Sequence, residues 1–335
     1  MERSRGSRAI GAWLIATFAL IGVLVVVGGA TRLTGSGLSM VDWSPLGAAP
    51  PGSAAEWGTL YDEYRASPQF QQVNHWMTLD DFKGIFWWEY VHRQLGRLVG
   101  LVYGLPFLWF LFRGRLSREL VWRGWIGLGL GGLQGLVGWW MVKSGLVSRP
   151  EVSHYRLAVH LSLALLAAMW ILWMWLGTRP AGRPRDPVSA RVSWIFTGVV
   201  SLQIVWGAFM AGKKAGWRYD TWPDMDGAFI PEGALGSLTD LVEDGDTIHW
   251  VHRTLGWLVL VSAVWLWTRL RHPVRGPANA VLWLTLLQFG LGVATVMASI
   301  PVTLGVAHQL GAFCLLSVAI WGAHSCSSRP PSSAP

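Results

Sequence analysis

A twelve-residue motif occurs twice in this chain, and each copy carries a histidine at the same place. Residues 88–99 read Trp-Glu-Tyr-Val-His-Arg-Gln-Leu-Gly-Arg-Leu-Val, and residues 248–259 read Ile-His-Trp-Val-His-Arg-Thr-Leu-Gly-Trp-Leu-Val. The copies place His92 and His252 just inside apolar stretches long enough to span a bilayer. Imidazole is the side chain best suited to bind haem iron axially. The repeat therefore predicts iron ligation inside a membrane.

Each copy is followed, two apolar stretches later, by a further histidine near a predicted helix start. These are His160 in the first half and His308 in the second. A single intramembrane histidine is more often a satisfied polar contact than a ligand, but four at matching repeat positions favour ligation. We predict two haem irons, one between His92 and His160 and one between His252 and His308. Zinc fits less well, because a tetrahedral site needs all of its ligands in one place.

An arginine directly follows the histidine in both copies. Arg93 and Arg253 could pair with haem propionates at the outer face, because guanidinium–carboxylate hydrogen bonds are charge-assisted. Alternatively, both side chains extend to interfacial water. The sequence leaves these two interpretations open.

The copies differ three residues before the histidine, where the first has Glu89 and the second has His249. Residues three apart share a helical face, so Glu89 would lie beside the ring bound by His92. A carboxylate there could accept a proton or stabilise charge, or it could be a solvated group at the membrane surface. The role of His249 stays open, including exchange with His252 as a ligand. This asymmetry indicates chemistry in the first half and electron storage or transfer in the second.

Membrane-spanning helices are needed to position these groups. The chain has 335 residues, of which 52% are hydrophobic and 14% charged, against about 25% charged in soluble domains. A hydrocarbon core of about 30 Å requires roughly 20 apolar residues per helix. Eight stretches meet this requirement: 10–30, 86–112, 121–142, 155–177, 192–212, 248–268, 278–298 and 303–323.

The net charge of +8 follows the predicted topology and does not indicate nucleic-acid binding. Arginines gather at the N-terminus and in alternate loops, so the positive-inside rule predicts two cytoplasmic termini. The long loops 31–85 and 213–247 would then face outward. All four histidines would lie near the outer face, about 6–9 Å below the boundary at about 1.5 Å per residue.

The fold class that we predict is an all-α polytopic membrane protein with two tandem four-helix bundles. The halves would be residues 1–178 and 190–325, joined by a cytoplasmic linker, 179–189, and followed by a disordered tail, 326–335. Parallel repeats imply a pseudo-two-fold axis along the membrane normal. The small residues that suit helix packing in lipid leave homo-oligomer formation open.

Two segments carry a family resemblance. Residues 28–40, Gly-Gly-Ala-Thr-Arg-Leu-Thr-Gly-Ser-Gly-Leu-Ser-Met, and residues 86–93, Phe-Trp-Trp-Glu-Tyr-Val-His-Arg, closely resemble haem A synthase. The resemblance covers nearly the whole chain and fits the mitochondrial and alphaproteobacterial branch. Many Gram-positive members have cysteine pairs in the outer loops, whereas this chain has only Cys314 and Cys326.

The resemblance implies an inner-membrane oxidoreductase that oxidises the C8 methyl of haem O to a formyl group, giving haem A for cytochrome oxidase. It implies a haem b cofactor on His252 and His308, and the haem substrate on His92 and His160. The essential glutamate of the family falls on Glu89. Implied partners are haem O synthase, cytochrome oxidase assembly proteins and an unidentified electron partner.

Two other functions remain open from the sequence. One is a dihaem cytochrome b-type electron carrier, which would hold both haems permanently. The other is a haem-delivery protein that binds haem without oxidising it.

Overall fold

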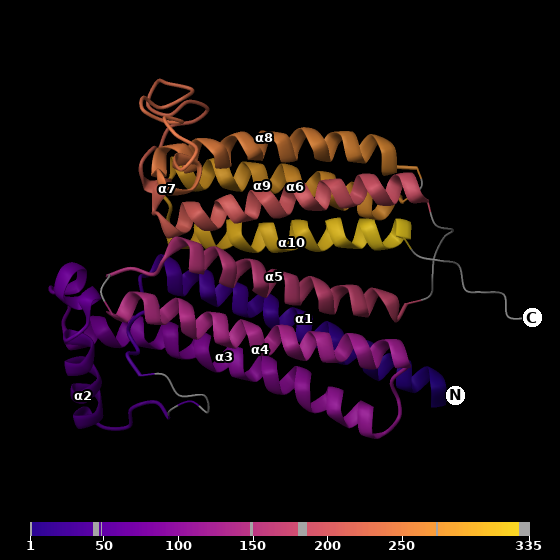
Figure 1. The fold of residues 1–335 in the computed structure, drawn as a ribbon, viewed down its shortest axis with the longest axis horizontal. Coiled ribbons are helices and arrows are strands. Elements are labelled where there is room, and N and C mark those ends of the chain that lie inside the picture. Colours follow the sequence, from indigo (N-terminus) through magenta and orange to yellow (C-terminus); the bar gives the residue numbers. More distant parts are fainter. Residues whose placement is uncertain are drawn as a thin grey trace, which may run out of the picture. The chain divides into compact units, whose positions relative to one another are not determined.

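Long helices make up most of the computed structural model, which describes residues 2–42, 47, 49–147, 150–179, 186–272 and 274–327. A helix covers each of the eight predicted apolar stretches (Figure 1). In chain order they are α1 (Glu2–Leu33), α3 (Leu79–Phe112), α4 (Arg118–Val147), α5 (His154–Gly177), α6 (Pro187–Gly212), α8 (Gly245–Leu270), α9 (Arg275–Met297) and α10 (Val302–Ser327). The part of the chain that is described contains no strand, only an isolated bridge between Met225 and Ala228.

Six of these helices are long and apolar enough to cross a membrane: α1 from Arg8 onward, α3, α5, α6, α9 and α10. The described parts of α4 and α8 fall outside this set. Helix α4 is rich in glycine and tryptophan, and α8 carries His249, His252 and Arg253 near its start. The polar groups with candidate functions therefore lower the hydropathy of α8. The chain is a helical, multi-pass membrane protein.

The chain divides into two compact units, one of residues 1–18 and 165–335 and the other of residues 19–164. Each predicted histidine pair falls within a single unit. The predicted repeat boundaries at 178 and 190 remain a prediction. Residues 180–185 of the expected linker and 328–335 of the expected tail lie outside the described residues, and α10 reaches Ser327.

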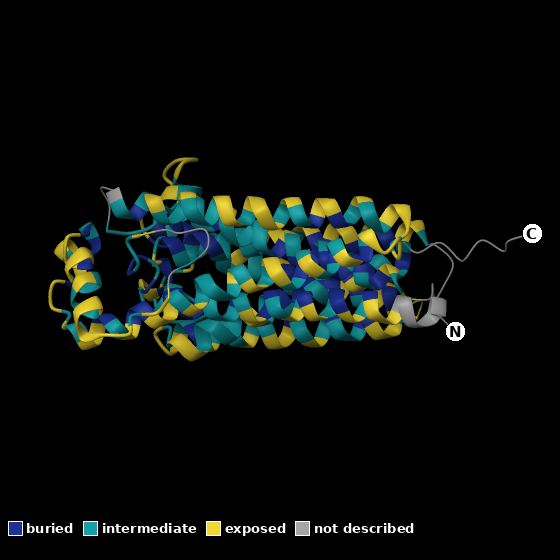
Figure 2. Ribbon diagram, turned by 90° about the horizontal axis from the view of Figure 1, so that it is seen from below, coloured by how far each residue is buried: buried dark blue, intermediate teal, exposed yellow. Residues whose placement is uncertain are grey.

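Four helices form a ring within the unit that contains the C-terminal half. Helix α6 contacts α8 and α10, and α9 contacts the same two helices. Small side chains such as Ala208, Ala263 and Ala319 are buried between them, which allows the close approach that stabilises helix pairs in lipid. Figure 2 shows buried residues where helices face one another and exposed residues on the outward faces.

The other unit contains α3 packed against α4. The hydroxyl of Tyr103 on α3 donates to the carbonyl oxygen of Gly124 on α4 at 2.9 Å. A Cβ at Gly124 or Gly127 would collide with the ring of Phe107 or Tyr103, respectively. The glycines of α4 thus make room for the aromatic face of α3.

Residues 49–85 contain helical elements where the sequence predicted a long loop. Helix α2 (Ala54–Arg65) is capped by Ser53, and a π-helical turn, η1 (Phe70–Asn74), follows it. Helix α3 begins at Leu79, before residue 86, because Thr78 and Asp81 form a reciprocal capping box. Buried aromatic side chains join α2 to the start of α3.

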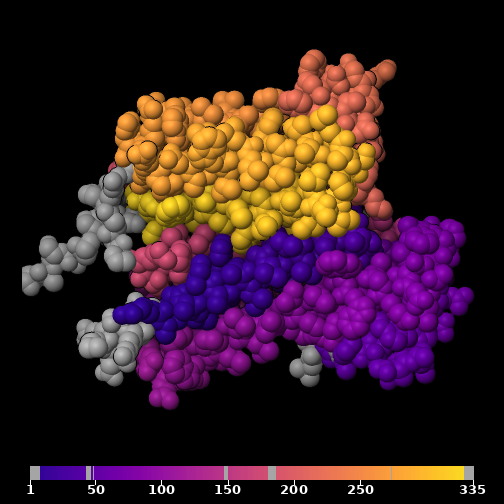
Figure 3. All heavy atoms as spheres, turned by 180° about the vertical axis from the view of Figure 1, so that it is seen from behind, coloured from indigo at the N-terminus to yellow at the C-terminus, as the bar shows by residue number. Residues whose placement is uncertain are grey.

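The segment between α6 and α8 includes a short 3₁₀ turn, η2 (Ala215–Trp217), and α7 (Asp240–Glu243). Ion pairs fix both of its ends: Lys213 with Glu243 at 2.7 Å and Arg218 with Asp246 at 3.0 Å. The middle of the segment stands out from the helices of its own unit (Figure 3).

Candidate haem-binding sites and active site

His252 on α8 and His308 on α10 face one another, with ring centroids 6.4 Å apart and ring planes at 79°. Metal–imidazole bonds are about 2 Å long and the ring nitrogens lie about 1 Å from the centroid, so two axial ligands have centroids roughly 6 Å apart. The observed separation therefore fits one iron between the two rings. Among the described residues, no group of three or more His, Cys, Asp or Glu could hold a metal ion.

Each ring of this pair packs against a glycine on a neighbouring helix. A Cβ at Gly207 on α6 would lie 3.2 Å from Cε1 of His252. A Cβ at Gly292 on α9 would lie 3.0 Å from Cε1 of His308. These glycines leave space that any other residue would fill, and the imidazoles occupy it.

A glycine of a neighbouring helix also packs against each histidine of the other predicted pair. A Cβ at Gly28 on α1 would lie 2.9 Å from Nε2 of His92 on α3, and one at Gly138 on α4 would lie 3.0 Å from Cε1 of His160 on α5. All four predicted histidines are therefore in contact with a glycine of an adjacent helix.

Glutamine side chains reach three of the four histidines. Nε2 of Gln134 lies 3.2 Å from Nδ1 of His160, and Nε2 of Gln288 lies 3.1 Å from Nδ1 of His308. Nε2 of Gln203 donates to the carbonyl oxygen of His252 at 3.0 Å and lies 3.5 Å from its Nε2. The Oε1 atoms of all three amides are buried and have no hydrogen-bond partner among the described residues.

Glu89 is 2% exposed, which excludes the solvated carboxylate that the sequence left open. Its Oε2 accepts hydrogen bonds from the hydroxyl of Ser39 at 2.7 Å and from the backbone N–H of Met40 at 2.9 Å. Its Oε1 accepts from Nε of Arg93 at 3.0 Å and from Nη2 at 2.6 Å. The carboxylate is held in one position by three different residues.

The two arginines that follow the repeated histidines have equivalent contacts. Arg93 also donates to the carbonyl oxygens of Met40 and Asp42, both at 3.0 Å. Nε of Arg253 donates to Nε2 of His249 at 2.9 Å, and its Nη1 donates to the carbonyl oxygen of Asp224 at 2.6 Å. In each unit, the arginine connects a segment between two long helices to the helix that carries the histidine.

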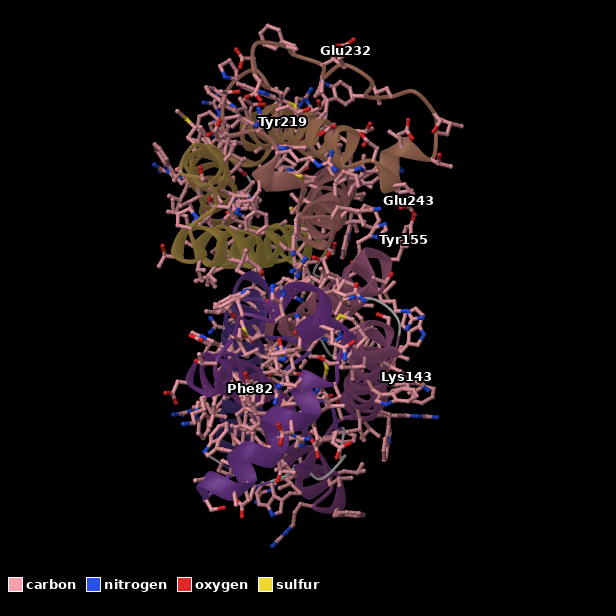
Figure 4. The ribbon with its side chains drawn as sticks, turned by 90° about the vertical axis from the view of Figure 1, so that its left-hand side faces the viewer. Phe82, Lys143, Tyr155, Tyr219, Glu232 and Glu243 are labelled. Atoms are coloured by element: carbon pink, nitrogen blue, oxygen red, sulfur yellow. The ribbon has the colours of Figure 1, made fainter. Side chains whose placement is uncertain are left out.

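His249 thus occupies the place that Glu89 has in the other unit, as the partner of an arginine four residues later. It is fully buried, and the ring of Tyr219, labelled in Figure 4, lies 5.7 Å from its own. One donor atom of Arg253, Nη2, is buried without a hydrogen-bond partner among the described residues. That atom is available to an anionic group.

The sequence predicted the histidines, the arginines and Glu89 as site residues, and the structure adds the glycines and glutamines that surround the imidazoles. Ser39 and the N–H of Met40 were also missed, because they belong to a segment expected to be a loop. A signal was present: a glutamine stands four residues before Gly138, Gly207 and Gly292. Glycine and glutamine are common in helices, so this spacing alone does not indicate a site.

Comparisons with known proteins identify the family of this chain. A family model named COX15-CtaA and described as "Cytochrome oxidase assembly protein" matches residues 11–320. A protein of Paramagnetospirillum magneticum named Heme A synthase is 44% identical over 337 residues, covering 96% of this chain and 95% of the relative. Proteins of the same name from Bradyrhizobium sp. and Nitrosomonas eutropha are 43% and 41% identical, over 97% and 93% of this chain and 93% and 92% of their own lengths. The chain therefore belongs to the COX15-CtaA family of cytochrome oxidase assembly proteins.

Proposed function

We propose that this chain is a haem A synthase, a membrane oxidoreductase that converts the C8 methyl of haem O to the formyl group of haem A. The observation that carries this proposal is the inequality of the two histidine sites. One has a buried, fully hydrogen-bonded carboxylate, Glu89, one turn from His92. The other has His249 in the equivalent place. The relatives named Heme A synthase support the same reaction.

The site of His252 and His308 is assigned to a haem b cofactor. The 6.4 Å separation of the rings supports the assignment of His252 and His308 as the residues that would hold one haem iron. The unpartnered Nη2 of Arg253 supports pairing with a haem propionate, since a buried guanidinium donor requires an acceptor. When bound, the haem would supply a one-electron redox centre; the chain itself orients it.

The site of His92 and His160 is assigned to the haem substrate. Conversion of a methyl to a formyl group breaks C–H bonds and takes up one oxygen atom, and a fixed carboxylate beside the ring would accept a proton or stabilise the charge that develops. Glu89 is suited to this role because Ser39, Met40 and Arg93 hold its carboxylate in place. Arg93 would contribute both by this ion pair and by pairing with a propionate of the substrate.

The membrane arrangement proposed for this function has eight spans in two tandem four-helix halves, related by a pseudo-two-fold axis along the membrane normal. Helices α4 and α8 would cross with the six more apolar helices because their polar residues face haem. Both termini would be cytoplasmic and both haem sites near the outer face of the inner membrane. Haem O synthase, cytochrome oxidase assembly proteins and an electron partner would act with the chain.

A conversion assay tests this function. Cells that make haem O but not haem A are given the chain or its Glu89→Gln variant, and extracted haems are separated by chromatography. We expect haem A with the unaltered chain. Glu89→Gln should keep its bound haem but lower haem A formation by about 10²-fold or more, the size of a general acid–base contribution.

Glu119→Gln is the matched control. Glu119 also pairs with an arginine four residues later, Arg123, but its side chain is 69% exposed and lies on α4. This variant should form haem A at the unaltered level. Normal haem A formation by Glu89→Gln would exclude Glu89 from the chemistry, and absence of haem A with the unaltered chain would favour a dihaem electron carrier.

A further inference from the structure

A four-residue spacing links the helices that face the histidines. Gln134 precedes Gly138, Gln203 precedes Gly207, and Gln288 precedes Gly292, each by four residues. Residues four apart lie on one face of a helix, so each glutamine and its glycine address the same imidazole. Four residues before Gly28, on α1, stands Leu24. His92 is therefore the one predicted ligand whose contacting glycine is preceded, four residues earlier, by leucine in place of glutamine.

The contacts follow this difference. Glutamine amides lie within 3.5 Å of ring nitrogens of His160, His252 and His308. Among the hydrogen bonds of the described residues, none joins the ring of His92 to another side chain. Its ring instead packs against Gly28.

The unpartnered amide oxygens indicate what the glutamines do when iron is bound. An imidazole that binds a metal through one nitrogen carries its proton on the other, and that N–H needs an acceptor. The Oε1 atoms of Gln134, Gln203 and Gln288 are buried acceptors without a partner among the described residues. A turn of the Gln134 amide would bring this oxygen to an imidazole N–H of His160, because its nitrogen already lies beside the ring. The amide nitrogens of Gln203 and Gln288 also donate to the carbonyl oxygens of His252 and His308, at 3.0 and 2.9 Å, and so hold the backbone that carries each ring.

Space for such an amide also exists beside His92. A Cβ at Gly256, four residues after His252, would lie 3.6 Å from Nε2 of Gln203. The equivalent glycine after His92 is Gly96, where a Cβ would meet nothing within 4 Å. The space that the Gln203 amide fills beside Gly256 is therefore open beside Gly96, and Leu24 does not fill it.

We infer that Gln134, Gln203 and Gln288 are positioning residues that fix three axial histidines, and that Leu24 leaves His92 as the ligand that releases iron. Substrate and product haem would then exchange by opening at His92, while His160 keeps its orientation. This inference rests on the proposed function, because it explains how one of two similar sites holds an exchangeable haem. Neighbours that orient a metal-binding histidine are typically worth about 10–100-fold in metal affinity.

The test is the rate of haem release from the purified full-length protein, followed by transfer to excess apomyoglobin. Leu24→Gln should slow release from the exchangeable site by about 10-fold or more, and Leu24→Met, of similar volume but without an amide, should not. Gln134→Met should speed release from the same site, whereas Gln72→Met, on the exposed turn η1, should not. Gln288→Met should speed release only from the slowly exchanging site.

The absorption spectrum of each variant distinguishes positioning from loss of folding. Gln134→Met should lower the fraction of iron with two histidine ligands, while Leu24→Gln, which adds a hydrogen bond, should raise it. Equal release rates for Leu24→Gln and Leu24→Met would overturn the inference. Because release is measured without turnover, a protein that makes no haem A but separates these two variants would refute the proposed function and keep the inference.

Discussion

At the scale of residues, the four histidines depend on the glycines that face them. The histidine pairs and the nearby carboxylate could be predicted from the sequence because ionisable side chains are rare inside a membrane and usually have a function there. The partners of those groups could not be predicted from the sequence. Arg93 was expected to pair with a propionate or to extend to interfacial water, whereas the structure pairs it with Glu89 and two carbonyl oxygens. The role of an amide or a glycine follows from the side chain that a neighbouring helix places beside it, and the sequence does not show that contact.

Gly292→Ala should impair retention of haem b. The added Cβ would lie 3.0 Å from Cε1 of His308 and force the ring to move. Overpacking of this kind costs about 1–3 kcal/mol, and about 1.4 kcal/mol is tenfold in an equilibrium constant, so we expect about tenfold weaker retention. Haem b bound per purified protein, after titration with haem, measures it.

Gly290→Ala is the control for this substitution. Gly290 lies on the same helix, and a Cβ there would meet nothing within 4 Å. The two variants gain the same helix propensity. If both retain haem b equally, the contact between Gly292 and His308 does not constrain the ligand.

At the scale of elements, the eight long helices could be predicted from the sequence, and the helical elements between α1 and α3 could not. Long apolar stretches identify helices in lipid directly. Residues 31–85 have no such pattern, because the aromatic core of that segment comes from positions scattered between Met40 and Tyr90. Only tertiary packing brings those rings together.

Tyr64→Phe should loosen this segment. The buried Tyr64 hydroxyl donates to Oε1 of Gln69 at 3.0 Å and accepts from Nδ2 of Asn74 at 2.7 Å. Its loss leaves two buried polar atoms unpaired, at about 1–3 kcal/mol. Limited proteolysis of the segment should therefore become faster, while Thr59→Ala, at an exposed position of α2, should change it little.

The same tyrosine gives a pH dependence. Burial, opposed by the hydrogen bond from Asn74, raises the pKa of Tyr64 above its ordinary value. The unfolded segment therefore loses this proton at lower pH than the folded one, and stability falls as pH rises above about 10. Proteolysis that stays constant across this range in the unaltered protein would contradict the role assigned to Tyr64.

At the scale of the whole molecule, two similar histidine sites serve different purposes in the proposed enzyme. The repeat in the sequence predicted both sites, and the replacement of Glu89 by His249 in the second copy predicted that the sites differ. The structure adds a second difference, Leu24 against Gln203. Both changes fall on the site assigned to the substrate, where a haem must react and then leave.

The most direct test is the haem content of the full-length protein purified from cells that also make haem O. We predict haem b together with haem O or haem A in the unaltered protein. His92→Ala should keep haem b and lose the other two, whereas His308→Ala should lose haem b selectively. Haem b alone in the unaltered protein, or loss of the same haem from both variants, would contradict the assignment of one cofactor site and one substrate site.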